Sequence, residues 1–167
     1  MIQKKICMLG YFSVGKTSLV EQFVRSIFSE KYQSTLGVKV DKKIIDVDGQ
    51  EVSLMLWDLA GDNSYINLKQ VYLKGSAGFL VVADGTRSIT LETALDIKNN
   101  LQKNYPDVPF IILLNKSDLQ NQWETEQADI KKLEAEGIKV VLTSAKTGDL
   151  VEETFTALGR LILKKNK

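Results

Sequence analysis

Short apolar runs alternate with amphipathic stretches along this chain. Runs that suit strands occupy residues 5–9, 78–83, 110–114 and 139–142. Two of them, Gly-Phe-Leu-Val-Val-Ala at 78–83 and Phe-Ile-Ile-Leu-Leu at 110–114, are apolar throughout, which is typical of parallel strands buried on both faces. The pattern therefore predicts an α/β fold, in which parallel strands alternate with helices.

Helices are predicted where apolar residues recur at helical spacing. The first begins at Lys16 and carries Leu19, Val20 and Phe23 on one face. Others are expected over 90–104, 125–136 and 150–163, and Gly137 is a suitable residue to end the second of these three. Residues 26–36 and 58–74 read as loops, and the second of these loops leads into a further helix.

A hairpin is predicted between the first helix and the buried strands. Residues 38–47 and 51–57 flank Asp48-Gly49, a dipeptide that favours tight antiparallel turns. Lysines along the first of these strands suit a sheet edge, because charge there discourages pairing with other chains. We predict one domain, residues 1–167, with a six-stranded, mostly parallel sheet, one antiparallel edge strand and about five helices on both faces.

Composition narrows the classes of function. The 167 residues include 22 Lys+Arg and 21 Asp+Glu, and this net charge of +1 gives no reason to expect a nucleic-acid partner. There is no histidine, which excludes histidine bases and His-ligated metals. The one cysteine, Cys7, is expected to be a core residue. No apolar run approaches the ~18 residues of a membrane span, so we expect a cytoplasmic monomer.

Residues 10–17 form the most informative motif, G-x-x-x-x-G-K-T, directly after the first strand. Glycines let the backbone wrap a polyphosphate, and the helix N-terminus that follows favours anions. Lys16 would reach the terminal phosphates and the Thr17 hydroxyl would ligate Mg²⁺. The predicted phosphate loop comprises Phe12, Ser13, Val14, Gly15, Lys16 and Thr17.

Other chemically useful residues also follow strands, where ligands bind in open parallel sheets. Asp58 leaves the second hairpin strand and would hold Mg²⁺, while Gly61 would let a backbone N–H approach a phosphate. Alone, this D-x-x-G motif is more typical of an ordinary turn than of a binding site. Its place after a strand, in a chain that also has a phosphate loop, favours a binding function.

Two further motifs point to guanine. Asn115-Lys116-Ser117-Asp118 follows the 110–114 strand, and the Asp118 carboxylate would accept hydrogen bonds from N1–H and the amino group of guanine, which adenine does not offer. The Lys116 stem would lie along the base. Ser144-Ala145-Lys146 follows the last strand and would offer backbone N–H groups to the guanine carbonyl.

The four motifs in this order resemble the Ras superfamily of small GTPases over essentially the whole chain. Residues 31–38 and Trp-Asp-Leu-Ala-Gly at 57–61 are similar to the Rab branch. The resemblance implies a P-loop NTPase (G-domain) fold, bound GTP or GDP with Mg²⁺, and a switch between the two nucleotide states. It implies that Thr35 ligates Mg²⁺, Ser18 contacts the α-phosphate, Phe28 packs on guanine and Leu119 lies in the base site, although Phe28 is also consistent with core packing.

Three departures from the family predict slow hydrolysis. The usual water-orienting Gln is replaced by Asp62, whose carboxylate repels the phosphates unless it turns outward to solvent. Phe12 would crowd the space above the γ-phosphate. None of the three arginines (Arg25, Arg87 and Arg160) lies in the 26–36 loop, so an internal arginine finger is not expected. Lys16, Thr35, Gly61 and Asp62 are the candidate catalytic residues.

Alternative functions remain at this point. The chain could be a GTP-binding scaffold locked in one nucleotide state; a P-loop kinase or ATPase is disfavoured by the guanine motif. Effectors and regulators would bind the switch regions, where a hydrophobic surface is expected from Ile27, Tyr65, Ile66 and Leu68. Ile66 and Leu68 are equally consistent with side chains that face the core. The last residues contain no cysteine that could be lipidated, so no stable membrane anchor is expected in this chain. Two explanations fit: the protein resembles divergent or bacterial relatives, or its tail was trimmed.

Overall fold

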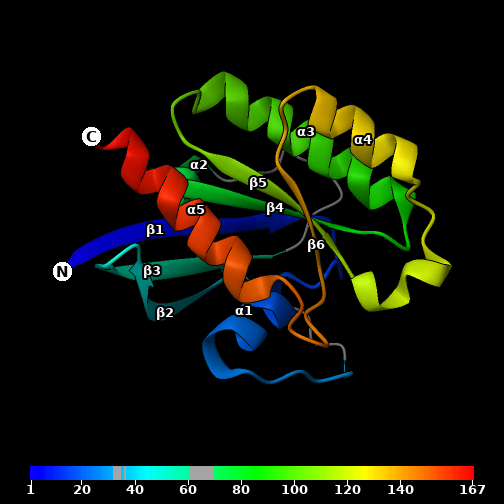
Figure 1. Cartoon of the computed structure of the whole chain (residues 1–167), viewed down its shortest axis with the longest axis horizontal. Helices are drawn as coiled ribbons and strands as arrows, with labels where there is room; N and C mark the ends of the chain where they lie inside the picture. The colour runs from blue at the N-terminus through cyan, green and yellow to red at the C-terminus, as the bar shows by residue number, and fades with distance from the viewer. Residues whose placement is uncertain (32–34, 36, 61–69) are drawn as a thin grey trace.

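The computed structural model describes residues 1–31, 35, 37–60 and 70–167. The chain folds into a central sheet flanked by helices (Figure 1). In chain order the elements are β1 (Ile2–Gly10), α1 (Lys16–Arg25), β2 (Val38–Val47), β3 (Gln50–Leu59), α2 (Gln70–Leu73), β4 (Gly78–Asp84), α3 (Ser88–Asn104), β5 (Phe110–Asn115), the 3₁₀ helix η2 (Ser117–Gln122), α4 (Gln127–Ala135), β6 (Val140–Thr143) and α5 (Val151–Lys165).

The sheet has six strands in the order β2-β3-β1-β4-β5-β6. Only the β2–β3 pair is antiparallel, and β2 lies at the edge, which confirms the predicted hairpin. Its turn residues have positive φ, 52° at Asp48 and 88° at Gly49, as a two-residue hairpin turn requires. The remaining pairs are parallel, and parallel strands need the crossover connections that the helices supply. The predicted fold class is therefore confirmed.

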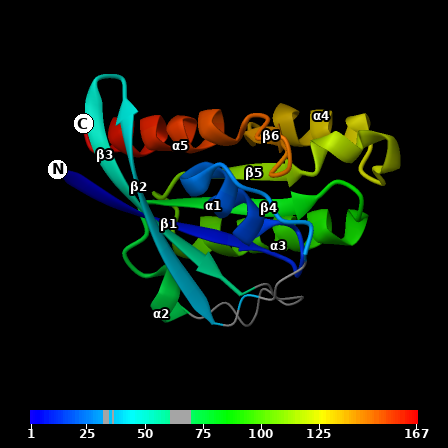
Figure 2. The ribbon, with the colours of Figure 1, turned by 90° about the horizontal axis from the view of Figure 1, so that it is seen from below.

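Helices cover both faces of the sheet and bury two hydrophobic clusters. The cluster under α1 and α5 includes Phe23 and Phe155, whose rings stack with centroids 3.8 Å apart. The cluster on the other face packs α2, α3 and α4 on the sheet and includes Leu73, Ile97 and Ile130. Figure 2 shows α5 along one side of the sheet and α3 along the other. The strand β4 is buried along its whole length, as its apolar run predicts.

Several boundaries differ from the predictions by a few residues, and one element was not predicted. Helix α3 begins at Ser88 rather than at residue 90, because the Glu124 carboxylate accepts bonds from the Ser88 backbone N–H (3.1 Å) and hydroxyl (2.9 Å). This distant side chain caps the helix. The helix η2 was not predicted, since it begins after Lys116 in a left-handed conformation that local sequence does not reveal.

The two termini of the chain lie on the side of the molecule opposite to the carboxyl ends of the parallel strands. Both termini lie at one end in Figures 1 and 2, and the carboxyl ends of β1, β4 and β5 point to the other. The loops that follow these strands are thereby gathered at one edge of the sheet. Within the described residues, no helix is both long and apolar enough to cross a membrane.

Candidate functional site

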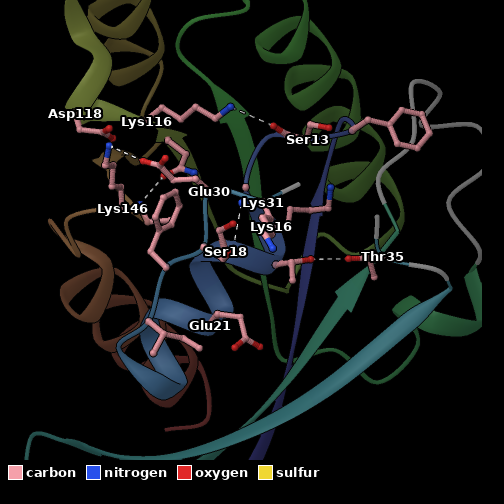
Figure 3. A pocket seen from close by; sticks show the side chains of 18 of the residues that line it. Ser13, Lys16, Ser18, Glu21, Glu30, Lys31, Thr35, Lys116, Asp118 and Lys146 are labelled. Atoms are coloured by element: carbon pink, nitrogen blue, oxygen red, sulfur yellow. Dashed lines mark hydrogen bonds and ion pairs between the residues drawn. The ribbon is translucent and has the colours of Figure 1, made fainter. Parts of the chain in front are cut away.

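A cavity of about 870 Å³ lies at the carboxyl ends of the strands, a size that suits a nucleotide-sized ligand (Figure 3). Segments far apart in the sequence contribute to its wall. Most of the predicted site residues line it: Phe12, Ser13, Gly15, Lys16, Thr17, Ser18, Phe28, Thr35, Asn115, Lys116, Asp118, Leu119, Ala145 and Lys146. Val14 and Ser144 are buried behind this wall.

The phosphate loop between β1 and α1 has a backbone that only glycine fits at one position. Gly15 has φ 101°, and a Cβ there would lie 2.3 Å from the Asn115 side-chain nitrogen. Gly15 precedes α1, whose N-terminus has no side-chain cap. The first N–H groups of α1 are therefore suited to bind an anion, with the helix dipole adding to the attraction.

Lys16 is almost fully buried beside this loop. Its ammonium donates to the carbonyls of Gly10 (3.1 Å) and Tyr11 (2.9 Å). The pKa of Lys16 is lowered to about 8, chiefly by burial and in smaller part by the nearby Arg87, while the attraction of Asp58 opposes the shift. Its charge therefore varies with pH near neutrality, which is unusual for a lysine.

Three oxygen-bearing side chains meet at the start of α1. The Thr17 hydroxyl lies 2.5 Å from the Thr35 hydroxyl and donates to Asp58 Oδ2, also at 2.5 Å. Burial raises the pKa of Asp58, although Thr17 and Lys16 oppose this. Asp58 Oδ1 is buried without a hydrogen-bond partner among the residues that the structure describes. An orphaned carboxylate oxygen beside two hydroxyls is a donor set that fits Mg²⁺, which binds few protein oxygens and completes its shell with water and phosphate.

Asn115, at the end of β5, holds two other loops together. Its amide nitrogen donates to the Val14 carbonyl at 3.0 Å. Its amide oxygen accepts from the Thr143 hydroxyl and the Ala145 N–H, both at 3.2 Å. A single buried amide therefore links the phosphate loop to the loop after β6, and nothing in this geometry requires it to touch a ligand.

Asp118 faces the cavity from η2, where the Ser144 hydroxyl donates to its Oδ1 at 2.8 Å. This bond orients the carboxylate that is predicted to read guanine. The N–H groups of Ser144 and Ala145 donate to Asp149 O and Asn115 Oδ1 at 3.1 and 3.2 Å. A guanine carbonyl would compete with these bonds. Across the mouth of the cavity, Lys146 forms an ion pair with Glu30 at 3.2 Å.

Several sequence predictions concern the outer part of the site. Gly61, Asp62, Tyr65, Ile66 and Leu68 lie outside the described residues. Phe28 and Ile27 line the cavity and are 38% and 53% exposed. Phe12 is 46% exposed and packs edge to face on Tyr11, with centroids 5.9 Å apart.

Sequence reasoning missed Asp84, Arg87 and Trp123. Asp84 ends β4 with its side chain 1% exposed. Burial disfavours its charge, but hydrogen bonds from Lys116 and Thr86 outweigh this and hold the pKa of Asp84 below its ordinary value. A signal existed, because Asp84 follows an apolar run just as Asp58 and Asn115 do.

Trp123 packs behind the guanine motif. Its indole N–H donates to the Lys116 carbonyl at 2.9 Å. Its ring lies so close to Gly85 that a Cβ there would be 2.1 Å away. Lys116 has φ 71°, a left-handed conformation that costs free energy in a residue other than glycine. Trp123 thus helps to hold the backbone from which Asp118 is presented.

Comparison with known proteins agrees with this geometry. The sequence matches the Ras family over residues 5–164. It is 33% identical over 167 residues to Ras-related protein Rab-32C of Dictyostelium discoideum, with 98% of this chain and 75% of the relative covered. It is 31% identical over 164 residues to Ras-related protein Rab-13 of Canis lupus familiaris (97% and 81% covered). It is 34% identical over 171 residues to Ras-related protein YPTC6 of Chlamydomonas reinhardtii (96% and 77% covered). The chain therefore belongs to the Ras family, as a Rab-like small GTP-binding protein.

Proposed function

We propose that this protein binds GTP and GDP with Mg²⁺ in the cavity at the strand ends and acts as a molecular switch with slow intrinsic GTP hydrolysis. The observation that carries the proposal is the convergence of phosphate-loop, guanine-motif and Thr35 side chains on one cavity. Residues from the loops after β1, α1, β5 and β6 meet there although they are separated along the chain. An unrelated use of these motifs would not require this.

Each end of the cavity has a proposed role. The N–H groups of residues 13–17, with the Lys16 ammonium, would bind the phosphates and stabilise the charge that develops during hydrolysis. Thr17, Thr35 and Asp58 would hold Mg²⁺, which neutralises phosphate charge when bound. Gly61 would bring a backbone N–H to the γ-phosphate. These roles are supported by the meeting of the three oxygens and by the orphaned Asp58 Oδ1.

The base site is proposed at η2 and the loop after β6. Asp118, oriented by Ser144, would accept two hydrogen bonds from guanine. Lys116 and Phe28 would lie against the base, with Leu119, Ala145 and Lys146 completing the pocket. Ser18 would contact the α-phosphate.

Slow hydrolysis is proposed from the side chains that flank the γ-phosphate position. Asp62 cannot donate to the phosphate while it accepts from water, and its charge would repel the phosphate. Phe12 lines the cavity at this end. Arg25 and Arg160 pair with Asp41 and Asp48. Arg87 is engaged by Asp84 and by the Phe12 carbonyl. We expect a single-turnover rate at or below about 10⁻⁴ s⁻¹, the range of unassisted small GTPases.

Two measurements test this proposal. In the first, ATP is made to compete with GTP for purified protein; GTP is expected to win by about 10⁴, and equal competition would favour an ATPase or kinase. In the second, GTP-loaded protein is followed by chromatography over a day. A rate near 10⁻² s⁻¹ would contradict slow hydrolysis, and unchanged GTP would favour a scaffold locked in one nucleotide state.

Partners are proposed at the switch regions, which include Thr35 and the exposed Ile27. A protein that binds only one nucleotide state is the expected effector, and a monomer is the expected form of the chain. Pull-downs with protein loaded separately with GDP and with a non-hydrolysable GTP analogue test this expectation, and identical captures from both samples would contradict it.

A further inference from the structure

Asp84, which belongs to none of the four nucleotide motifs, is the centre of a buried ionic cluster. Its Oδ1 accepts from the Thr86 N–H (2.9 Å) and hydroxyl (2.7 Å). Its Oδ2 accepts from two cations, Lys116 Nζ at 2.8 Å and Arg87 Nε at 3.1 Å. Such a cluster holds its members in fixed positions, because a buried carboxylate without its cations is costly.

Both cationic side chains contact the phosphate loop as well as Asp84. Arg87 Nη2 donates to the Phe12 carbonyl at 2.8 Å. Lys116 Nζ lies 3.4 Å from the Ser13 carbonyl, and Figure 3 shows Lys116 extended toward Ser13. The carbonyls of two successive loop residues are thus held by two cations on a single carboxylate oxygen. The Arg87 guanidinium also lies 5.7 Å from the centre of the Tyr11 ring.

The clamped loop segment has an unfavourable backbone. Ser13 has φ 59°, in the left-handed region that residues other than glycine avoid. Such a conformation persists only where surrounding contacts impose it. Here the contacts are the two held carbonyls on either side of the Ser13 Cα, so Arg87 and Lys116 together account for the strained loop.

We propose that Arg87 is a positioning residue for phosphate binding, which rests on the nucleotide site proposed above. Arg87 holds the Phe12 carbonyl away from the cavity and so turns the N–H of the same peptide, that of Ser13, toward the phosphates beyond the first. The planar fork of the guanidinium suits this task, because separate nitrogens reach Asp84 and the Phe12 carbonyl. A lysine offers one nitrogen and cannot span both partners with the same geometry.

A purely structural role for Arg87 predicts different behaviour. Arg87 also directly precedes α3 as its N-cap residue, and its N–H donates to the Asp84 carbonyl at 3.0 Å. Loss of a structural ion pair would lower stability and weaken every ligand of the site alike. Loss of a positioning residue would lower the affinity for ligands that reach the Ser13 N–H and leave the affinity for other ligands unchanged.

The experiment compares GDP with GMP, which shares the base, the ribose and the first phosphate. Affinities are measured by titration calorimetry at fixed magnesium for the wild type, Arg87→Gln, Arg87→Lys and the control Arg160→Gln. Arg160 makes only an exposed pair with Asp48 among the described residues, at 3.0 Å. Thermal unfolding of each variant measures the structural contribution.

Arg87→Gln is expected to lower the affinity for GDP about tenfold, the effect of one charge-assisted hydrogen bond. The affinity for GMP should change less than about twofold. Arg87→Lys keeps a positive charge beside Asp84 and should lower the affinity for GDP by an intermediate factor. This variant tests the proposal if Arg87→Gln does not fold. Arg160→Gln should match the wild type. Equal losses for GDP and GMP, or a GDP affinity within twofold of the control in both Arg87 variants, would overturn the proposal. Wild-type protein that does not bind GDP would instead overturn the nucleotide site itself.

Discussion

The end of the cavity that is proposed to bind guanine (the guanine end) and the end that is proposed to bind phosphate (the phosphate end) are built differently. At the guanine end the polar groups already bond to one another: Ser144 to Asp118, and Asn115 to both Val14 and Ala145. At the phosphate end, Asp58 Oδ1 has no described partner, and the Lys16 ammonium binds carbonyls of its own loop. The proposed base site is therefore organised by bonds within the protein, whereas the proposed phosphate site contains groups that a ligand would satisfy better.

This difference suggests a division of labour. A rigid set of bonds gives specificity, because a wrong base leaves oriented polar groups unpaired. Groups that gain partners only from a ligand make the local structure respond to that ligand, which a switch needs. Substitutions at the guanine end should therefore change which nucleotide binds, and changes at the phosphate end should alter how the protein responds to the bound nucleotide.

The largest expected effect is at the guanine end. Asp118→Asn replaces an acceptor with a donor at the oxygen that would accept from the guanine amino group. We expect GDP affinity to fall by about 10³ or more, and xanthosine diphosphate, which has a carbonyl in place of that amino group, to bind better than GDP.

Competition titrations with both nucleotides measure this reversal. Asp149→Asn is the matched control, because it makes the same chemical change in the loop after β6 on an exposed side chain. A GDP affinity within tenfold of wild type for Asp118→Asn would mean that Asp118 does not read the base.

The next effect concerns hydrolysis at the phosphate end. Asp62→Gln removes a negative charge, whose repulsion at ~5 Å is about 3 kcal/mol, and restores a group that both donates and accepts. Single-turnover hydrolysis should become faster by between about tenfold and a hundredfold, while GDP affinity stays within about twofold. An unchanged rate would show that Asp62 points away from the attacking water.

A smaller effect is expected from the support behind the guanine motif. Trp123→Phe removes the hydrogen bond to the Lys116 carbonyl, which is worth about 1 kcal/mol. The free energy of unfolding should fall by about that amount, and GDP should dissociate about fivefold faster. Trp57→Phe is the control, since the Trp57 ring packs under the Lys5 ammonium instead. Equal dissociation rates in the two variants would assign no positioning role to Trp123.

The smallest effect is the pH dependence of phosphate binding. The pKa of Lys16 is about 8 in the free protein, so its ammonium is mostly present at pH 7 and mostly lost at pH 8.5. GDP affinity without added magnesium should fall about fourfold over this interval. The free energy of unfolding of the free protein should instead rise with pH between pH 8 and the unfolded pKa of 10.5. In this interval the unfolded state binds more protons than the folded state.

Calorimetry in two buffers with different protonation enthalpies checks this prediction. Proton uptake on GDP binding at pH 8.5 is the expected result, because the phosphates restore the Lys16 charge. Binding without proton uptake would mean that Lys16 is already charged in the free protein at that pH.

Much of the fold follows from local patterns. Apolar runs located β4 and β5, and Asp48-Gly49 located the turn of the edge hairpin. These signals are strong because burial on both faces and a two-residue turn each demand particular residues. Boundaries were less predictable: the start of α3 depends on Glu124, a residue 36 positions away from Ser88.

The site divides in the same way. Motifs named most of the residues that line the cavity, since phosphate and guanine chemistry restrict residue type and spacing. Residues that hold those motifs in place could not be named in this way. Asp84 and Lys116 meet only because β4 and β5 are neighbours, and Trp123 reaches Lys116 only after η2 turns the chain. Their roles depend on tertiary contacts, which a motif does not record.

The bonds of Asn115 also have a consequence for protein synthesis. This amide joins Val14, 101 residues earlier, to Ala145, 30 residues later. A nascent chain emerges from the ribosome N-terminus first, so the phosphate loop is exposed long before its partners are translated. A chain released before Ala145 would carry the whole loop and lack the bond that joins it to the base site. Stable capture of a guanine nucleotide would therefore begin only after Ala145 has been made, and a bound nucleotide would distinguish chains that include Ala145 from chains that terminate before it.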